Sequence, residues 1–392
     1  MTASAILPQV LAALDAVLPP QRPIVLHEPE FQGNEWQYVK VCLDSGWVSS
    51  VGSYVSRFEH ILEDFTGAAR SIAVVNGTAG LHVALQLAGV LPGDEVLVPA
   101  LTFVATANAV SYCGATPHFV DCEEITLGVD PVALAAYLEE IAELKAGACI
   151  NRQTGRSIRA LVVMHTFGHP VVLDALLALS ERFALPLIED AAESLGSTYH
   201  RRHTGTLGRL GVLSFNGNKI ITTGGGGAIL TNDHTLADRA KHLTTTARTS
   251  ERWVFRHDCI GYNYRMPNLN AALGCAQMET LPTMLASKRS LARRYQDAFA
   301  GIVGLRFVTE PEDCCSNYWL NALLLDESRE SLLPELLEAT NAAGVMTRPA
   351  WALMHHLPMY AACPRMSLPV AESLEKRLLN IPSSAVLGAA HD

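Results

Sequence analysis

The chain has 392 residues, 49% of them hydrophobic, which is enough to bury the cores of two or three domains and excludes a mainly disordered protein. Its 29 Lys and Arg residues against 39 Asp and Glu give a formal net charge of −10, the wrong sign for binding nucleic acid along a surface. The nine cysteines form no C-x-x-C pair, and no His or Cys spacing matches a zinc site. We therefore expect a reducing, cytoplasmic setting and no metal centre.

Neither an export signal nor a membrane span is expected. The first 18 residues are apolar, but no Lys or Arg precedes the apolar stretch and Asp15 lies within it. The longest run without a charged residue, 96–120, is interrupted by Pro99 and Pro117 and by polar groups that a bilayer would leave without partners. This run fits a strand, a helix and a second strand of a soluble domain.

Short apolar runs alternate with helix-like segments between residues 71 and 233. The helical spacing is clearest over residues 81–88 and 173–183. This alternation predicts an α/β domain with a mostly parallel sheet covered by helices on both faces, and ligands then bind at the carboxyl ends of the strands. The predicted strands are residues 71–75, 95–98, 118–121, 160–165, 186–190 and 211–215.

The pattern changes in the last third of the chain. A long helical segment follows Asn268, and strands at residues 305–308 and 318–325 then alternate with Leu-, Ala- and Glu-rich helix. We expect an N-terminal arm and a large domain over residues 1–265, followed by an interdomain helix and a small α+β domain over residues 266–392.

Lys219, one of only six lysines, lies alone in an apolar, glycine-rich stretch from Ser214 to Gly227. An amine shielded from water beside glycines is suited to act as a nucleophile or a base. The alternative is an ordinary loop lysine beside a flexible turn.

Asp190 ends an apolar strand and begins an acidic cluster, so its carboxylate points into the expected ligand crevice. It could be a metal ligand, a helix N-cap or the partner of a protonated heterocyclic nitrogen. Gly77 and Thr78 follow another strand and precede a helix, where free backbone N–H groups form an anion site, and Ser214 could supply a further phosphate contact. A simple strand-to-helix turn is the competing interpretation.

Phe103 follows the strand at residues 95–98 and could stack on a flat ring above the same crevice, although core packing is the more frequent role of a lone Phe. Together the sequence offers an amine for an aldehyde, a carboxylate for a pyridinium nitrogen, an anion pocket for a phosphate and an aromatic ring to stack. These are the requirements of pyridoxal 5′-phosphate (PLP).

The order and spacing of these motifs resemble the DegT/StrS family of PLP-dependent sugar aminotransferases over nearly the whole chain. The resemblance implies a fold type I enzyme with a seven-stranded, mostly parallel sheet. The matching segments are Asn76-Gly-Thr-Ala-Gly-Leu81, Asp94-Glu-Val-Leu-Val-Pro99, Thr102-Phe-Val-Ala-Thr106, Glu189-Asp-Ala-Ala192, Gly205-Thr-Leu-Gly208, Ser214 to Lys219 and Gly261-Tyr-Asn-Tyr-Arg-Met266.

The resemblance also assigns roles. It implies that Lys219 carries the cofactor, that Asp190 pairs with the pyridinium nitrogen and that Phe103 stacks on the ring. The implied phosphate contacts are Gly77, Thr78 and Ser214. Many relatives have Gln or His where Glu193 stands near the cofactor's ring hydroxyl, so this contact departs from the family pattern. Asn263 matches an asparagine that reaches the phosphate of the neighbouring subunit's cofactor, which implies a homodimer with shared active sites.

A finer resemblance concerns the substrate. The segments that carry it are Asn34-Glu-Trp-Gln-Tyr-Val-Lys40, Gly46-Trp-Val-Ser-Ser-Val-Gly52, Ser214-Phe-Asn-Gly-Asn-Lys219, Thr347-Arg-Pro349 with Trp351, Leu357-Pro-Met-Tyr360 and Leu368-Pro-Val-Ala-Glu-Ser373. They are similar to a subgroup that aminates C4 of nucleotide-linked 4-keto-6-deoxy-N-acetyl sugars for legionaminic acid and related bacterial surface sugars. UDP is the nucleotide we expect. Diphosphate favours Arg, and a flat base or sugar face favours an aromatic ring. The substrate-contact candidates are Arg348, Trp351, His355 and His356, for which a solvated domain surface is the alternative. His165 is expected near the cofactor, with a satisfied core histidine as the alternative, and Trp47, Ser49 and Ser50 are expected on a substrate-facing N-terminal arm.

The expected reaction is a two-stage transamination in which L-glutamate leaves its nitrogen on the cofactor and the sugar ketone then receives it. A PLP-dependent sugar dehydratase of the same fold is one alternative, but such relatives replace the lysine with histidine. A regulatory sugar-binding protein is a second alternative, which an intact Lys219 and Asp190 disfavour. A nicotinamide-dependent enzyme is a third, and its glycine fingerprint is not evident in the sequence.

Overall fold

The computed structural model describes residues 6–251 and 253–389. A central sheet has the strand order β1 (Arg70–Val74), β11 (Gly227–Thr231), β10 (Leu210–Ser214), β7 (Leu187–Asp190), β6 (Ser157–Met164), β2 (Glu95–Pro99) and β3 (Thr116–Val120). Along this path β11 alone runs antiparallel to its neighbours. The expected seven-stranded, mostly parallel sheet is confirmed, and the hairpin of β4 (Ala142–Lys145) and β5 (Ala148–Asn151) widens it to nine strands.

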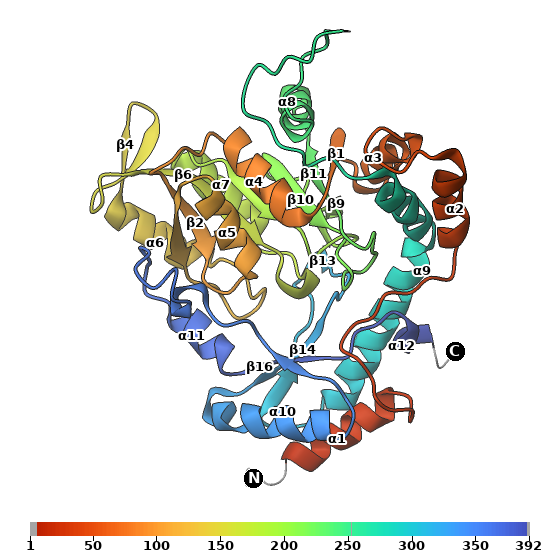
Figure 1. Cartoon of the computed structure of the whole chain (residues 1–392). Helices are drawn as coiled ribbons and strands as arrows, with labels where there is room; N and C mark the ends of the chain where they lie inside the picture. Colours follow the sequence, from red (N-terminus) through yellow and green to blue (C-terminus); the bar gives the residue numbers. More distant parts are fainter. Residues whose placement is uncertain (1–5, 252, 390–392) are drawn as a thin grey trace.

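Helices cover both faces of the sheet because successive residues of each strand point to opposite sides. In β2, Val96 and Val98 pack in one core with α4 (Gly77–Leu87) and α5 (Val104–Tyr112). Leu97 packs in another, whose helices are α6 (Pro131–Ile141) and α7 (Leu173–Arg182). The helices α3 (Ser53–Thr66) and α8 (His234–Thr244) complete this large domain, which fills the upper part of Figure 1.

The smaller domain is built on a second sheet, entirely antiparallel, with the strand order β12 (Leu305–Phe307), β14 (Asn321–Leu325), β16 (Leu378–Ile381) and β15 (Arg348–Pro349). The 32-residue helix α9 (Asn268–Phe299) runs along both domains (Figure 1). The other helices of the C-terminal part are α10 (Leu333–Ala342), α11 (Pro369–Glu375), α12 (Val386–Ala389) and the 3₁₀ turns η3 (Glu327–Leu332) and η4 (Met354–His356).

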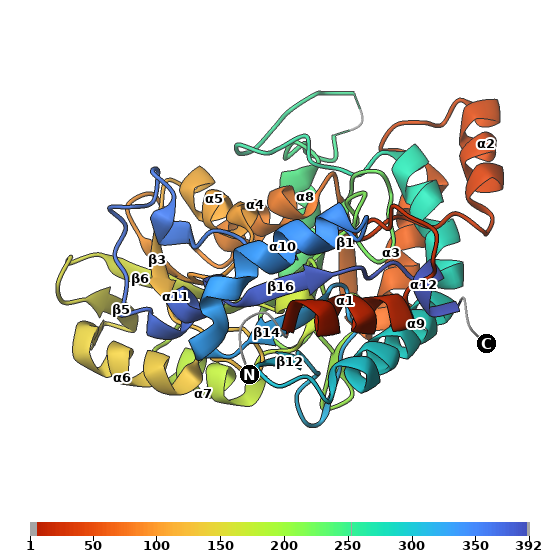
Figure 2. The same cartoon turned by 90° about the horizontal axis from the view of Figure 1, so that it is seen from below.

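The N-terminal helix α1 (Ile6–Val17) lies with the C-terminal part of the chain. Its apolar face shares one buried core with the end of α9, with β12 and with α10, and Figure 2 shows it beside α10 and β16. The expected boundaries, 1–265 and 266–392, therefore do not follow the packing at the N-terminus. A periodic apolar pattern predicts that α1 has a buried face but does not identify the partner of that face.

A third, three-stranded sheet joins the two domains. Within it β8 (Thr198–Tyr199) pairs with both β9 (Arg202–His203) and β13 (Cys314–Cys315).

All nine cysteines are free. Among residues 6–251 and 253–389, no helix combines the length and the apolar character needed to cross a bilayer.

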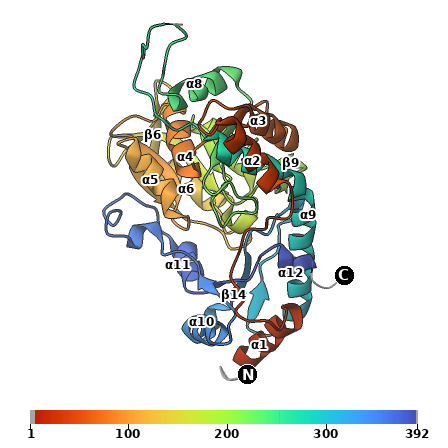
Figure 3. The ribbon, with the colours of Figure 1, turned by 45° about the vertical axis from the view of Figure 1, so that its right-hand side comes forward.

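Two parts of the chain extend outward from the large domain. The helix α2 (Glu35–Ser45) lies against α9 at the periphery, and the segment after α8 projects from the body (Figure 3). This projecting segment, residues 245–251 and 253–262, exposes Phe255 and Ile260, which are 77% and 84% accessible to solvent. Large apolar side chains this exposed point to an interaction surface.

A buried ion pair fixes the segment that follows the projection. The two terminal nitrogens of the Arg265 guanidinium, Nη1 and Nη2, donate to the Glu59 carboxylate of α3 at 2.5 and 3.0 Å, and both side chains are about 7% exposed. Arg265 Nη1 also donates to the carbonyl of Ala73 in β1. Glu59 also accepts a hydrogen bond from the Ala73 amide. One carboxylate therefore connects α3, β1 and the segment after α8.

We expect Glu59→Gln to lower the unfolding free energy by about 3 kcal/mol, because it leaves the buried guanidinium without its counter-charge. The matched control is Glu143→Gln, which removes an exposed ion pair to Lys145 and should change stability by less than about 1 kcal/mol. Thermal unfolding of the two variants beside the unaltered chain measures the difference. Equal unfolding midpoints for the two variants would show that the Glu59–Arg265 ion pair contributes no more to stability than the exposed pair does.

Candidate active site

A cavity of about 340 Å³ lies at the carboxyl edge of the central sheet, where the segments after β1, β2, β7 and β10 meet. It brings together seven of the eight residues predicted to bind the cofactor and one predicted substrate contact, Trp351. The seven are Gly77, Thr78, Phe103, Asp190, Glu193, Ser214 and Lys219. The convergence follows from parallel strands, whose carboxyl ends face the same side.

Asp190 is the last residue of β7, and its carboxylate is almost fully buried. Thr106 donates its hydroxyl proton to Oδ2 at 2.7 Å, and the Ala192 amide donates to Oδ1 at 3.2 Å. Burial raises the pKa of Asp190, and the hydrogen bond from Thr106 opposes that rise. No helix begins after Asp190, because residues 191–197 form turns, so the N-cap interpretation is excluded.

The start of α4 is where the sequence predicts that an anion binds. Asn76 caps this helix by accepting a hydrogen bond from the Ala79 amide at 2.8 Å, while the amides of Gly77 and Thr78 have no partner within the helix. β11 passes so close that a Cβ on Gly227 would lie 2.7 Å from the Gly77 nitrogen. Glycine at 227 therefore allows the sheet to approach the helix end, and Ser214 stands beside Gly77 at the end of β10.

Lys219 follows β10 in a short turn, and its amine lies inside the cavity. The amine nitrogen Nζ is 3.3 Å from Oε1 of Glu193 and 3.8 Å from the centre of the Trp319 ring. Glu193 also accepts a hydrogen bond from the Phe167 amide at 2.9 Å. Burial raises the pKa of Glu193 to about 7, although Lys219 opposes the rise.

Aromatic side chains form one wall of the cavity. Phe103 precedes α5 and remains 49% exposed despite its size. Its ring lies edge-on to the Trp351 ring, with 6.2 Å between the two ring centres. Trp351 also contacts Phe167, whose ring centre is 5.2 Å away. A large ring left exposed within a cavity is suited to stacking on a flat ligand.

The residues present fit PLP. An amine, a buried carboxylate, free amides at a helix N-terminus and an exposed aromatic face surround one cavity, and each matches one group of the cofactor. Sequence reasoning missed four polar or aromatic lining residues, which are Asn76, Asn216, Asn218 and Trp319. The capping role of Asn76 was readable from its place before a helix, but Trp319 comes from the other domain and gave no local signal.

His165 does not line the cavity. It is completely buried, with Nε2 2.9 Å from Oε2 of Glu189 and Nδ1 accepting a bond from the Val171 amide at 3.3 Å. Both ring nitrogens are therefore engaged, which corrects the expectation of a substrate contact in favour of a satisfied core histidine.

Three other predicted substrate contacts also lie away from the cavity lining. His355 and His356, in η4, approach Glu372 and Glu375 at 3.5 and 3.1 Å. The exposed Arg348, in β15, donates to the Asn341 side chain at 3.2 Å. The segment that holds them does reach the cavity, but through Trp351.

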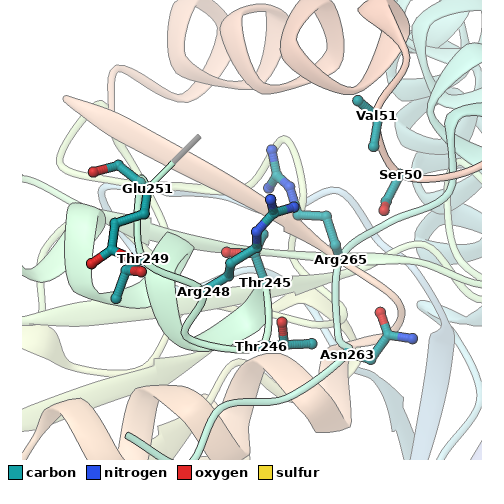
Figure 4. A pocket seen from close by; sticks show the side chains of 10 residues that line it. Ser50, Val51, Thr245, Thr246, Arg248, Thr249, Glu251, Asn263 and Arg265 are labelled. Atoms are coloured by element: carbon teal, nitrogen blue, oxygen red, sulfur yellow. The ribbon is translucent and has the colours of Figure 1, made fainter. Parts of the chain in front are cut away.

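Asn263 and Ser50 line a second, open pocket of about 580 Å³ (Figure 4). Arg248 and Arg265 also line it, so it gathers two guanidinium groups and several hydroxyls at the base of the projecting segment. Trp47 lines a further pocket beside α2. The remaining arm residue, Ser49, contacts the start of α9 through its carbonyl, which accepts a bond from the Asn268 amide at 3.0 Å.

Two groups of metal-ligating side chains occur among the described residues. They are His242, Asp258 and Cys259 in one place and His355, His356 and Glu372 in another, and neither group lines the cavity. His242 and Asp258 are already hydrogen-bonded to each other at 2.6 Å.

We expect Glu193 to make the folded chain less stable as the pH rises from about 5 to about 8. Because its pKa is about 7 in the fold against 4.5 ordinarily, the folded state binds this proton more tightly than the unfolded chain does. Glu193→Gln removes the effect, so its unfolding midpoint should gain a few degrees on the unaltered protein over this range, equivalent to about 2–3 kcal/mol. Parallel curves in a thermal-unfolding series against pH would contradict the assignment.

Comparisons with known proteins are consistent with this site. The model of the DegT/DnrJ/EryC1/StrS aminotransferase family matches residues 29–391. The chain is 38% identical to a GDP-perosamine synthase of Caulobacter vibrioides, covering 92% of this chain and 93% of that protein. It is 36% identical to a GDP-perosamine synthase of Escherichia coli O157:H7, with the same two coverages.

Solved structures share the fold. The aminotransferase TlmJ from Streptoalloteichus hindustanus superposes with a TM-score of 0.82 at 29% identity, covering 92% of this chain and 93% of that one. DesI, crystallised in the presence of its TDP-sugar product, superposes with a TM-score of 0.80 at 28% identity, covering 92% of this chain and 88% of that one.

Proposed function

Because the chain belongs to the DegT/DnrJ/EryC1/StrS aminotransferase family, we propose that it transfers an amino group from L-glutamate to C4 of a nucleotide-linked 4-keto-6-deoxy sugar. The enzyme is a PLP-dependent sugar aminotransferase of this family. The observation that carries the proposal is the cavity in which the Lys219 amine, the Asp190 carboxylate and the start of α4 face one another.

Six residues of the cavity have tasks in this reaction. Gly77, Thr78 and Ser214 hold the phosphate, and Phe103 covers one face of the ring. When bound, PLP supplies an electron sink for the bond that breaks at the substrate carbon. Asp190 would keep a proton on the ring nitrogen. The freed Lys219 amine would carry a proton from the donor's carbon to the cofactor carbon that held the aldehyde, and from that carbon to the sugar carbon in the second stage.

Lys219→Ala tests the central assignment. We expect the purified variant to lack the absorbance near ~420 nm that a lysine-bound cofactor gives and to lose turnover by a factor of at least ~10³. Lys40→Ala, which removes an exposed lysine paired with Asp44, is the matched control and should keep both properties. A Lys219→Ala enzyme that retained the absorbance and the turnover would contradict the proposal.

The substrate is the finer part of the proposal. The segments that resemble the N-acetyl-sugar subgroup favour a UDP-linked 4-keto-6-deoxy-N-acetyl sugar, used for legionaminic acid or a related bacterial surface sugar. Trp351 at the cavity and the exposed Arg348 on the same segment would then contact the nucleotide-sugar, with His355 and His356 beyond them. We expect the reaction to take place in the cytoplasm, and the nine free cysteines support this expectation.

A GDP-linked 4-keto-6-deoxy sugar without an acetamido group is the second candidate. It is favoured by the identity of 38% and 36% to two GDP-perosamine synthases. Incubation with [¹⁵N]glutamate and either keto sugar, followed by NMR of the product, distinguishes the two. If ¹⁵N appears on C4 of only one of the two sugars, that sugar is the substrate. The absence of ¹⁵N from both sugars would contradict amination at C4.

The second pocket supports a homodimer with shared sites. Asn263 and Ser50 were both expected at an active site, yet they line a pocket separate from that of Lys219. This arrangement suits a site completed by a second copy of the chain, in which the pocket in Figure 4 faces the partner's cofactor phosphate. The exposed Phe255 and Ile260 on the adjacent projecting segment supply apolar surface for the contact.

Mixed dimers test this arrangement. Lys219→Ala and Asn263→Ala chains are each expected to be impaired alone. If sites are shared, a mixed dimer carries one site with both defects and one site with neither, so mixing the two variants should restore up to about a quarter of the unaltered activity. Measurement of turnover after co-expression gives the result. No recovery, with mixed dimers demonstrated by two affinity tags, would contradict sharing.

A further inference from the structure

We propose that Glu193 and Trp319 form a resting site that holds the free ε-amine of Lys219 whenever that amine is not bonded to the cofactor. The inference rests on the proposed function, because it assumes that Lys219 alternates between a bonded and a free state. It concerns two positioning residues, one from each domain of the chain.

The amine is held from two directions. Its nitrogen lies 3.3 Å from Oε1 of Glu193 and 3.8 Å from the centre of the Trp319 ring. A carboxylate and an aromatic face both attract a positively charged group, and both act more strongly when water is excluded. The Lys219 side chain is only 12% exposed and the Glu193 side chain 2%.

The two holding groups are themselves fixed, which distinguishes a built site from a chance contact. The Trp319 indole donates from Nε1 to the Asn218 carbonyl at 2.7 Å, and this carbonyl belongs to the residue before Lys219. The Trp319 carbonyl accepts a bond from the fully buried Lys288 of α9 at 3.2 Å. The indole is therefore anchored at its ring and at its backbone.

A single buried side chain connects the two holding groups. The Asn317 side-chain oxygen accepts a bond from the Trp319 amide at 2.8 Å, and its nitrogen donates to the Glu193 carbonyl at 2.9 Å. The other oxygen of the Glu193 carboxylate is occupied by the Phe167 amide. One carboxylate oxygen, Oε1, thus remains directed at the amine.

The cavity holds two carboxylates, and the structure divides their tasks. Asp190 receives hydrogen bonds from Thr106 and Ala192, whereas the Lys219 amine pairs with Glu193. The amine is thereby paired with Glu193, while its charge still reaches Asp190 and opposes the rise in the pKa of that carboxyl.

Glu193 also takes part in the capture of the cofactor, as the acceptor of a proton from Lys219. When the cofactor binds, Glu193 would accept one proton from the Lys219 ammonium, which frees the nitrogen to replace the aldehyde oxygen. The two hydrogens left on the nitrogen would depart with that oxygen as water. No electrons are gained or lost in this exchange.

The test measures the reactivity of Lys219 in the full-length, cofactor-free chain. Trinitrobenzenesulfonate modifies free amines and not ammonium groups, and peptide mass mapping follows Lys219 beside the exposed Lys40 as an internal reference. We expect Glu193→Gln and Trp319→Leu each to speed the modification of Lys219 about fivefold relative to Lys40. Trp319→Phe keeps an aromatic face and should stay close to the unaltered chain.

Each outcome bears on the resting site separately from the proposed function. Unchanged Lys219 reactivity in both Glu193→Gln and Trp319→Leu would overturn the resting site, as would an equal increase in Trp319→Phe and Trp319→Leu. Cofactor uptake by the unaltered chain, read from its absorbance on adding PLP, tests the proposed function alone. A chain that binds PLP while its variants show no change retains the function and loses the resting site.

Discussion

The cost of burying negative charge governs the site. Three carboxylates, Glu189, Asp190 and Glu193, lie within five residues at the end of β7, and each is almost completely removed from water. A buried carboxylate is tolerated only when hydrogen bonds or a counter-charge offset its lost hydration. The fold supplies a different set of partners to each of the three, and these sets determine what each acid can do.

Glu189 is satisfied by the protein alone. It accepts bonds from the amides of Gly205, Leu207 and Gly208 and pairs with His165, so it holds a loop in place and has no capacity left for a ligand. Asp190 accepts two hydrogen bonds. Glu193 accepts one hydrogen bond from a backbone amide and pairs with the Lys219 amine. The acids nearest the cavity are the least completely satisfied, and they are the ones available for chemistry.

Local sequence patterns predicted the parts of the site that the sheet determines. Asp190 ends a strand and Gly77 and Lys219 each follow one, and a parallel sheet brings such positions to one edge. The sequence could not identify Trp319 as a neighbour of Lys219, because the contact depends on how the small domain packs. For the same reason, the sequence grouped α1 with the large domain, whereas its apolar face packs in a core with the smaller one. The strand β11 was missed because glycines precede it and begin it. His165 is the opposite case. Its position at the end of a strand suggested a contact with the ligand, but its buried ring pairs with Glu189 instead.

The anchoring of Trp319 has a consequence for dissecting the enzyme. Its indole comes from the segment that enters β14, so the smaller domain contributes a wall of the cofactor cavity as well as the region expected to contact the sugar. A fragment ending at the interdomain helix would leave the lysine uncovered on that side. Chimaeras that exchange C-terminal domains to alter sugar preference should therefore retain residues 317–319 of the recipient, or they will alter the lysine's surroundings together with the specificity.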